Sequence, residues 1–313
     1  MPLYAFPAKM MLEGTVVVQR TRNGDVELAY ETFGSPAGEP LLLIMGFGYQ
    51  MVWWPDSFCE LLAERGFHVA RFDNRDSGLS SHFPHDERPV AMRELVRRLF
   101  RGSPEPAYTS VDMAADAVHV MNALGWESCH VVGASMGGML AQLVALRHPD
   151  RVRTLVPLSS RPGQPARTLL RHLDFRTLLP MMRVGRNGKS NVETMVDTAR
   201  IIHGRGRGFD EQRTRAIAEH AESRRPLDSL ATRRHSEIRW PGDDPAGIRA
   251  PTLVLHGADD PIMRVSAARA IANAVAGAEL VVYPGMGHLF TPALESRIAD
   301  DIGDFARRAV PAG

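Results

Sequence analysis

The sequence predicts an α/β fold, with a mostly parallel central sheet flanked by helices and a helical cap insertion. Short apolar or β-branched runs alternate with longer helical runs along most of the chain, which is the pattern of a parallel sheet with right-handed crossovers. A Gly-Ala-Ser-Met-Gly pentapeptide at 133–137 stands between a short β-branched run and a longer helical run. No long β-branched run occurs between about 160 and 247, which indicates the insertion.

Each expected strand is an apolar or alternating run bounded by turn residues. In chain order these runs cover residues 15–18, 27–33, 40–45, 68–73, 129–132, 151–158, 251–256 and 279–283. Asn23-Gly24, between the first two runs, predicts a hairpin turn. Helical periodicity with capping residues and terminal glycines predicts helices over 57–65, 110–124, 138–146, 265–275 and 295–309.

We expect these elements to form one core, with a second unit inserted in it. A chain of 313 residues is long enough for one large α/β domain and a subdomain. The core is assigned to residues 1–159 and 248–313, and a helical cap over the carboxyl edge of the sheet to residues 160–247. Residues 81–108 are rich in Arg and Pro and predict no defined element.

Composition limits the partners and the compartment. The net charge of +1 gives no reason to expect nucleic acid, and no apolar stretch reaches the length of a membrane span. The first residues lack the pattern of a signal peptide, and Cys59 and Cys129 are expected as buried thiols, so we expect a cytoplasmic protein. The expected partner is a small-molecule substrate, without nucleic acid or membrane, and a homodimer is left open.

The pentapeptide makes Ser135 the candidate nucleophile. The run before it, 129–132, predicts a buried strand, and the run after it, 138–146, predicts a buried helix. A strand, a tight turn carrying Ser and a helix are the context of a nucleophile elbow, in which glycines let the two elements approach closely. The alternative is a glycine-rich turn with a serine that has no chemical role.

A serine hydroxyl needs a general base, and that base needs an orienting acid. His288 follows the strand signal at 279–283 and is the candidate base, the alternative being a histidine on a surface loop. Asp259 and Asp260 follow the signal at 251–256, and either could be the acid. Both loops follow the carboxyl end of a strand, where open α/β sheets place their sites.

Backbone N–H groups are the expected donors to an oxyanion. Met136 follows the nucleophile directly and is one candidate. Phe47, between Gly46 and Gly48 after the signal at 40–45, is the other, the alternative being an ordinary glycine turn.

These residues resemble the serine hydrolases of the α/β-hydrolase superfamily, and are most similar to the aclacinomycin methylesterase-like group of bacterial hydrolases. The similar segments are 43–48, 54–55, 71–80, 251–254, 260–262 and 284–288. In such relatives the aspartate before the proline is the triad acid, which selects Asp260. Met45 replaces the histidine that often begins the oxyanion loop, and the backbone donor is unaffected by this change. Ser135 is unlike the aspartate nucleophile of epoxide hydrolases and dehalogenases.

Apolar side chains after the oxyanion loop and in the insertion could line a substrate pocket, although ordinary core packing is the alternative for each. The pocket candidates are Tyr49, Gln50, Met51, Trp53, Trp54, Met181, Met182 and Trp240.

The expected function is cleavage of a carboxylic ester of a small or medium-sized apolar substrate, through an acyl-enzyme on Ser135, with no cofactor and no metal. The same triad could serve a thioesterase, an amidase or iminopeptidase, or a cofactor-free perhydrolase, haloperoxidase or lyase. A ligand-binding protein on the same fold needs no complete triad, whereas Ser135, Asp260 and His288 are all present.

Overall fold

The computed structural model describes residues 17–84, 106–163, 189–204 and 208–309, together with positions 172, 177, 180 and 184. Its central feature is an eight-stranded sheet in the order β1-β2-β4-β3-β5-β6-β7-β8. The strands are β1 Gln19–Asn23, β2 Val26–Phe33, β3 Glu39–Ile44, β4 Phe67–Phe72, β5 Cys129–Ala134, β6 Val152–Leu158, β7 Leu253–Gly257 and β8 Glu279–Tyr283. The strands β4, β3, β5, β6, β7 and β8 run parallel, and β1 and β2 pair antiparallel at one edge. The predicted fold class is confirmed.

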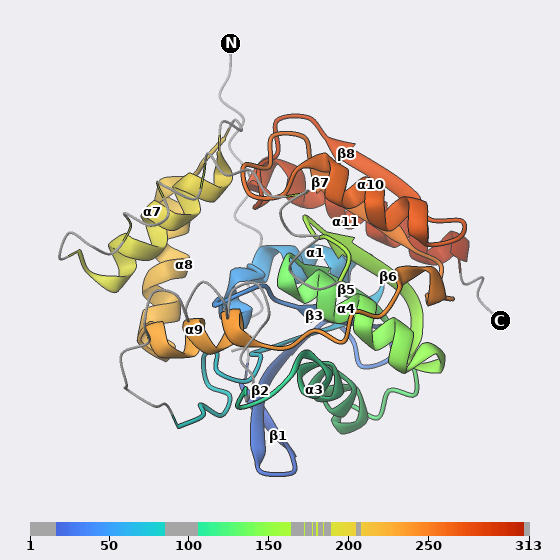
Figure 1. Cartoon of the computed structure of the whole chain (residues 1–313), viewed down its shortest axis with the longest axis horizontal. Helices are drawn as coiled ribbons and strands as arrows, with labels where there is room; N and C mark the ends of the chain where they lie inside the picture. Colours follow the sequence, from blue (N-terminus) through green and yellow to red (C-terminus); the bar gives the residue numbers. More distant parts are fainter. Residues whose placement is uncertain are drawn as a thin grey trace.

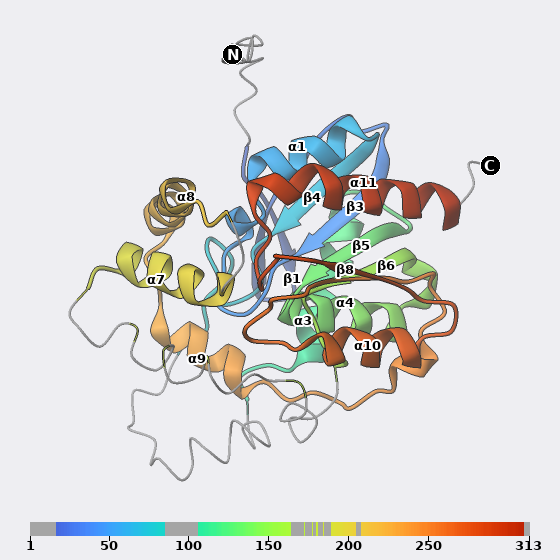
Figure 2. The same ribbon diagram turned by 90° about the horizontal axis from the view of Figure 1, so that it is seen from above.

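The helices form one layer on each side of the sheet and a group at its end. They are α1 Asp56–Glu64, α3 Ser110–Ala123, α4 Met136–Arg147, α7 Asn191–His203, α8 Glu211–Arg224, α9 Ser229–Glu237, α10 Val265–Ala274 and α11 Pro292–Ala309. Figure 2 shows α1 and α11 on one face of the sheet and α3, α4 and α10 on the other. Within the described ranges, no helix combines the length and apolar character needed to cross a membrane.

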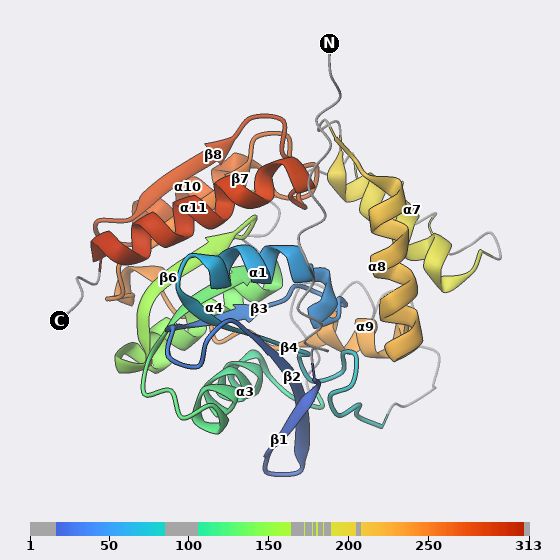
Figure 3. The ribbon, with the colours of Figure 1, turned by 180° about the vertical axis from the view of Figure 1, so that it is seen from behind.

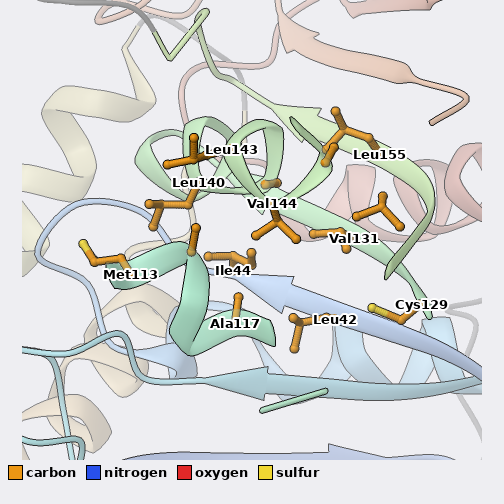
Figure 4. Close-up of a cluster of buried hydrophobic side chains, with 14 of the residues drawn as sticks. Leu42, Ile44, Met113, Ala117, Cys129, Val131, Leu140, Leu143, Val144 and Leu155 are labelled. Carbon is orange, nitrogen blue, oxygen red and sulfur yellow. The ribbon is translucent and has the colours of Figure 1, made fainter. Parts of the chain in front are cut away.

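Two apolar clusters, one on each face of the sheet, hold the layers together. On the α3/α4 face, Leu42 and Val131 of the sheet pack with Leu140 and Val144 of α4, and all four are fully buried (Figure 4). Burying one such side chain stabilises the fold by about 1.5–3 kcal/mol. Because α4 packs against β5, β6 and the neighbouring helix α3, most of its residues are buried, which explains its nearly continuous apolar sequence.

The first strand differs from the prediction. We expected it at 15–18, of which 15 and 16 lie outside the described residues, but β1 begins at Gln19 and Val17 is exposed. The sequence of β1, Gln-Arg-Thr-Arg-Asn, is polar because one side of this edge strand faces water, while on the other side Thr21 and Asn23 contact the polar side chains of His119 and Asp116 on α3. The hydrophobic signal therefore lay beside the strand rather than in it.

The carboxyl ends of the parallel strands meet at one edge of the sheet, beside α7, α8 and α9. In Figure 2 the arrowheads of β3 and β4 point toward the side on which these three helices lie, and Figure 1 and Figure 3 show the same helices set apart from the two flanking layers. The loops after β3, β5, β7 and β8 therefore open toward the inserted helices.

Candidate active site

Ser135 occupies a sharp turn between β5 and α4. Its backbone has φ 53° and ψ −117°, a conformation that non-glycine residues rarely adopt. Hydrogen bonds hold it there: Ser135 N donates to Leu158 O at 2.9 Å, and Ser160 Oγ donates to Ser135 O at 2.8 Å. A strained residue fixed by its neighbours is what a nucleophile elbow requires.

The two glycines of the pentapeptide permit this turn because they bring backbone against backbone. A Cβ on Gly133 would lie 2.2 Å from Gly137 O, and one on Gly137 would lie 2.1 Å from Ile44 O. Neither position has room for a side chain, so the glycines are required for the close approach of β5, α4 and β3.

The loops after β7 and β8 bring Asp260 and His288 together. His288 Nδ1 lies 2.7 Å from Asp260 Oδ2, and both side chains are buried. The other carboxylate oxygen, Oδ1, accepts hydrogen bonds from Ile262 N and Met263 N, both at 2.8 Å. Since an ionised carboxylate only accepts, the imidazole proton sits on Nδ1, and Nε2 is left with a lone pair that can take a proton.

The neighbouring aspartate has a different partner. Asp259 Oδ2 accepts a hydrogen bond from Gly285 N at 2.9 Å, and Asp259 N donates to Met286 O at the same distance. Asp259 thus ties the two loops together, whereas Asp260 contacts the imidazole of His288. From the sequence alone, either aspartate could have been the triad acid, and only the family resemblance selected Asp260.

The loop carrying His288 packs against the end of α7. His288 N donates to Ile202 O at 2.9 Å, and a Cβ on Gly287 would lie 2.1 Å from His203 O. The inserted helices therefore contact the candidate base through its backbone.

Sequence reasoning missed His256, which is fully buried at the end of β7. Its Nε2 lies 2.9 Å from Met263 O and 3.6 Å from Asp260 Oδ2. Burial lowers the pKa of His256, which favours its neutral form. Its spacing of four residues before Asp260, at the carboxyl end of a strand, is the signal that could have revealed it.

The candidate oxyanion donors flank Ser135. A Cβ on Gly46 would lie 3.2 Å from Ser135 Cβ and 3.8 Å from Ser135 Oγ, so the loop after β3 lies directly against the serine. Met136 is buried at the first position of α4, and Phe47 is 39% exposed in the loop. Asn74 Nδ2 donates to Met45 O at 3.0 Å and fixes the start of this loop, another contact that the sequence did not reveal.

The predicted pocket residues have several different surroundings. Tyr49 and Trp53 pack edge to face, with ring centroids 4.5 Å apart, while Trp54 is fully buried and stacks on Phe58. Met51 is also fully buried, and Trp240 packs against the cluster on the α3/α4 face. Met181 and Met182 lie outside the described residues.

Gln50 contacts α8. Its Nε2 donates to Ala221 O at 2.8 Å and to Arg225 O at 3.0 Å, and its Oε1 accepts from Arg224 Nη1 at 2.7 Å. Both polar atoms of this amide are thus bonded to the C-terminal end of α8 and the residue that follows it.

A pocket with a largely apolar lining lies beside the loop of His288. Leu289 and Phe290 of that loop line it, together with Trp53 from the core. Phe209, just before α8, and Ile217, within α8, complete the apolar part of the lining. This space could accept an apolar group, although Arg213 and Glu295 also line it and Ser135 and His288 do not. Among the described residues, no group of three or more His, Cys, Asp or Glu side chains is arranged to hold a metal ion.

A serine in a turn after β5, an aspartate after β7 and a histidine after β8, in that chain order, are characteristic of α/β-hydrolases. The chain belongs to this family. A family model described as the alpha/beta hydrolase fold matches residues 39–191.

Curated relatives extend the match over most of the chain. Rhodomycin D methylesterase DnrP of Streptomyces peucetius is 31% identical over 316 residues, covering 92% of this chain and 97% of the relative. Rhodomycin D methylesterase DauP of Streptomyces sp. (strain C5) is also 31% identical, over 91% of this chain and 96% of the relative. The resemblance predicted from the sequence is therefore confirmed.

A solved structure shows the same fold. The enol-lactonase from Burkholderia xenovorans LB400 superposes with a TM-score of 0.66 at 19% identity, covering 92% of this chain and 99% of that one.

Proposed function

We propose that this α/β-hydrolase is a serine esterase that cleaves a carboxylic ester with a catalytic triad of Ser135, His288 and Asp260. The contact that carries the proposal is the 2.7 Å hydrogen bond from His288 Nδ1 to Asp260 Oδ2, because it leaves Nε2 as a base for a serine held on a strained elbow. The methylesterase relatives, at 31% identity over most of the chain, support ester hydrolysis as the reaction class.

The chemistry proceeds in two half-reactions. Ser135 Oγ bonds to the ester carbonyl carbon while its proton moves to Nε2 of His288, and the carbonyl electron pair moves onto the oxygen. Collapse of this intermediate breaks the bond to the alcohol oxygen, which takes the proton from His288. Water then attacks the acyl-enzyme in the same manner, which releases the carboxylic acid and restores Ser135.

Backbone N–H groups of Phe47 and Met136 stabilise the oxyanion in both half-reactions. The closeness of Gly46 to Ser135 and the position of Met136 at the start of α4 support this assignment. The start of a helix also carries partial positive charge, which favours an anion there.

The substrate we infer is a methyl ester of an apolar acid. The apolar side chains of Leu289 and Phe290 in the pocket support an apolar acid portion, and the methylesterase relatives support methanol as the leaving alcohol. In this proposal residues 160–247 are a cap that closes over the substrate, and Tyr49 and Trp53 form part of its wall.

We also propose a cytoplasmic location and a free small molecule as substrate. Cys59 and Cys129 are buried free thiols, and burial raises the pKa of each to about 12, so neither is suited to disulfide exchange.

The test compares purified wild-type protein with the Ser135→Ala variant on a matched panel. The panel is the methyl ester, the methyl thioester and the primary amide of one aromatic carboxylic acid. We expect turnover of the methyl ester to exceed that of the amide, and to be lost in Ser135→Ala with an unchanged melting temperature. Ester turnover that persists in Ser135→Ala would refute the mechanism, and a preference for the thioester or the amide would replace the proposed substrate class.

A further inference from the structure

The loop carrying Phe47 is held from both sides. On the side of β4, Asn74 Nδ2 donates to Met45 O at 3.0 Å. On the side of α9, Gly48 N donates to His235 Nδ1 at 3.3 Å. The first contact fixes the peptide between residues 45 and 46, and the second fixes the peptide between Phe47 and Gly48.

The contact at Gly48 belongs to a packed surface. A Cβ on Gly48 would lie 3.2 Å from Thr232 Cγ2, so α9 sits directly on this residue. Thr232 and His235 are three residues apart and therefore share one face of the helix. Gly48 has φ 69°, so glycine suits this position both for its backbone conformation and for the close approach.

Both ring nitrogens of His235 have backbone partners that require the same tautomer. Nε2 lies 2.8 Å from Arg75 O, and a carbonyl can only accept, so the proton is on Nε2. Nδ1 then carries the lone pair that accepts the Gly48 N–H. Burial lowers the pKa of His235, which is 2% exposed, so the ring is neutral at pH 7.

The helix itself is anchored to the core next to this contact. Arg234 donates to both carboxylate oxygens of Asp76 at 2.7 Å, and the Asp76 side chain is fully buried. This two-bond ion pair and the bond from His235 to Arg75 O hold α9 to the turn after β4. Contacts with the buried core therefore fix the position of His235 Nδ1, which accepts the Gly48 N–H.

We propose that His235 is a positioning residue for the oxyanion hole, which orients the Phe47 N–H through the Gly48 N–H. This inference rests on the proposed function, because it assigns Phe47 as an oxyanion donor. The peptide that carries the Phe47 N–H lies between these two anchored peptides, and its Gly46 O accepts a hydrogen bond from Tyr49 N at 3.4 Å, so the Phe47 N–H is held in one direction before substrate arrives. A displacement of a catalytic group by 1 Å can cost about a hundredfold in rate.

Two substitutions distinguish the hydrogen bond made by Nδ1 of His235 from the one made by Nε2. In His235→Asn the amide oxygen can occupy the place of Nδ1 and accept the Gly48 N–H. In His235→Gln the amide nitrogen can occupy the place of Nε2 and donate to Arg75 O, which leaves Gly48 N without its acceptor. The two variants are alike in polarity and similar in size, so they form a matched pair.

We expect kcat for the methyl ester to remain within about threefold of wild type in His235→Asn and to fall about tenfold or more in His235→Gln, with KM within about threefold in both. A merely structural role predicts instead that both variants lower the melting temperature and kcat alike. Equal kcat values in the two variants, whether high or low, would overturn the proposal, as would a change confined to KM.

A spectroscopic measurement covers the case in which His235→Gln does not fold. Long-range ¹⁵N–¹H correlation on the wild-type protein reports which nitrogen of His235 carries the proton. We expect protonated Nε2 and unprotonated Nδ1; a proton on Nδ1 would overturn the proposal. Ser135→Ala distinguishes a failure of the proposed function from a failure of the role of His235. Ester turnover that persists in that variant refutes the proposed function, whatever the His235 variants show.

Discussion

Arg224 of α8 forms an ion pair with Asp73, which follows β4: Nη2 lies 2.9 Å from Oδ2, with side chains 6% and 0% exposed. Asp73 also accepts hydrogen bonds from Met51 N at 2.7 Å and Leu79 N at 2.9 Å. One buried carboxylate thus joins an inserted helix to the segment that follows the candidate oxyanion loop.

Arg224→Met should destabilise the protein by about 3 kcal/mol, because it leaves a buried carboxylate without its cationic partner. Urea unfolding measures this change. Arg215→Met on the same helix is the control: Arg215 is well exposed and lies 3.7 Å from Glu211, so its loss should cost less than about 1 kcal/mol. Equal losses of stability in the two variants would contradict the account of this ion pair.

Asp260→Asn should lower kcat about a thousandfold or more, because an amide cannot fix the His288 tautomer as a carboxylate does. Asp259→Asn is the matched control. Its amide oxygen can still accept the Gly285 N–H, so kcat should change less than about threefold. Steady-state kinetics on the methyl ester check both. A larger loss of kcat in Asp259→Asn than in Asp260→Asn would indicate that Asp259, and not Asp260, is the triad acid.

Gly137→Ala should cost about 3 kcal/mol or more, or prevent folding, since its Cβ would lie 2.1 Å from Ile44 O. Gly303→Ala in α11 is the control substitution. Its Cβ would lie 3.4 Å from Arg307 Nη1, which is an ordinary contact with a flexible side chain. That variant should gain about 0.5–1 kcal/mol from the lower entropy of the unfolded chain. Thermal unfolding compares the two, and a tolerated Gly137→Ala would contradict the close approach described here.

His130 should make stability depend on pH. Burial is the main cause that lowers the pKa of His130 from 6.5 to about 4, with the positive charge of Arg153 as a second cause. Between these two values the unfolded chain binds a proton that the folded protein does not, so the free energy of unfolding falls as pH decreases. The loss should approach about 3 kcal/mol between pH 7 and pH 4.

The His130→Asn variant isolates this contribution, because its amide can retain a bond to Thr154 Oγ1, which lies 2.8 Å from His130 Nδ1. Other buried histidines titrate in both proteins, so the relevant quantity is the difference between their stability profiles. Urea unfolding at several pH values should give a shallower slope for the variant below pH 6.5. Identical slopes would show that His130 does not contribute.

The elements around Ser135 could be predicted because their signals are local. The turn, its two glycines and the flanking runs are contiguous in the sequence, and the loops of Asp260 and His288 follow strong strand signals. The polar strand β1 carried no such signal, because one of its sides faces water and the other makes polar contacts with α3.

The role of His235 could not be predicted, because it arises from tertiary packing between residues far apart in the sequence. Its partners, Gly48 and Arg75, are 187 and 160 positions away. Gln50 illustrates the same limit: its sequence neighbourhood gave no sign that its amide bonds to the end of α8. Only the placement of the inserted helices decides such contacts.

The catalytic triad is tested most directly by active-site labelling with a fluorophosphonate, read by intact mass and peptide mapping. Wild-type protein, Ser135→Ala and Asp260→Asn are compared at pH 7.5. We expect one adduct on Ser135 in the wild type, none in Ser135→Ala, and much slower labelling in Asp260→Asn. An adduct on another residue, or labelling of Ser135 at the same rate in wild type and Asp260→Asn, would contradict the triad of Ser135, His288 and Asp260.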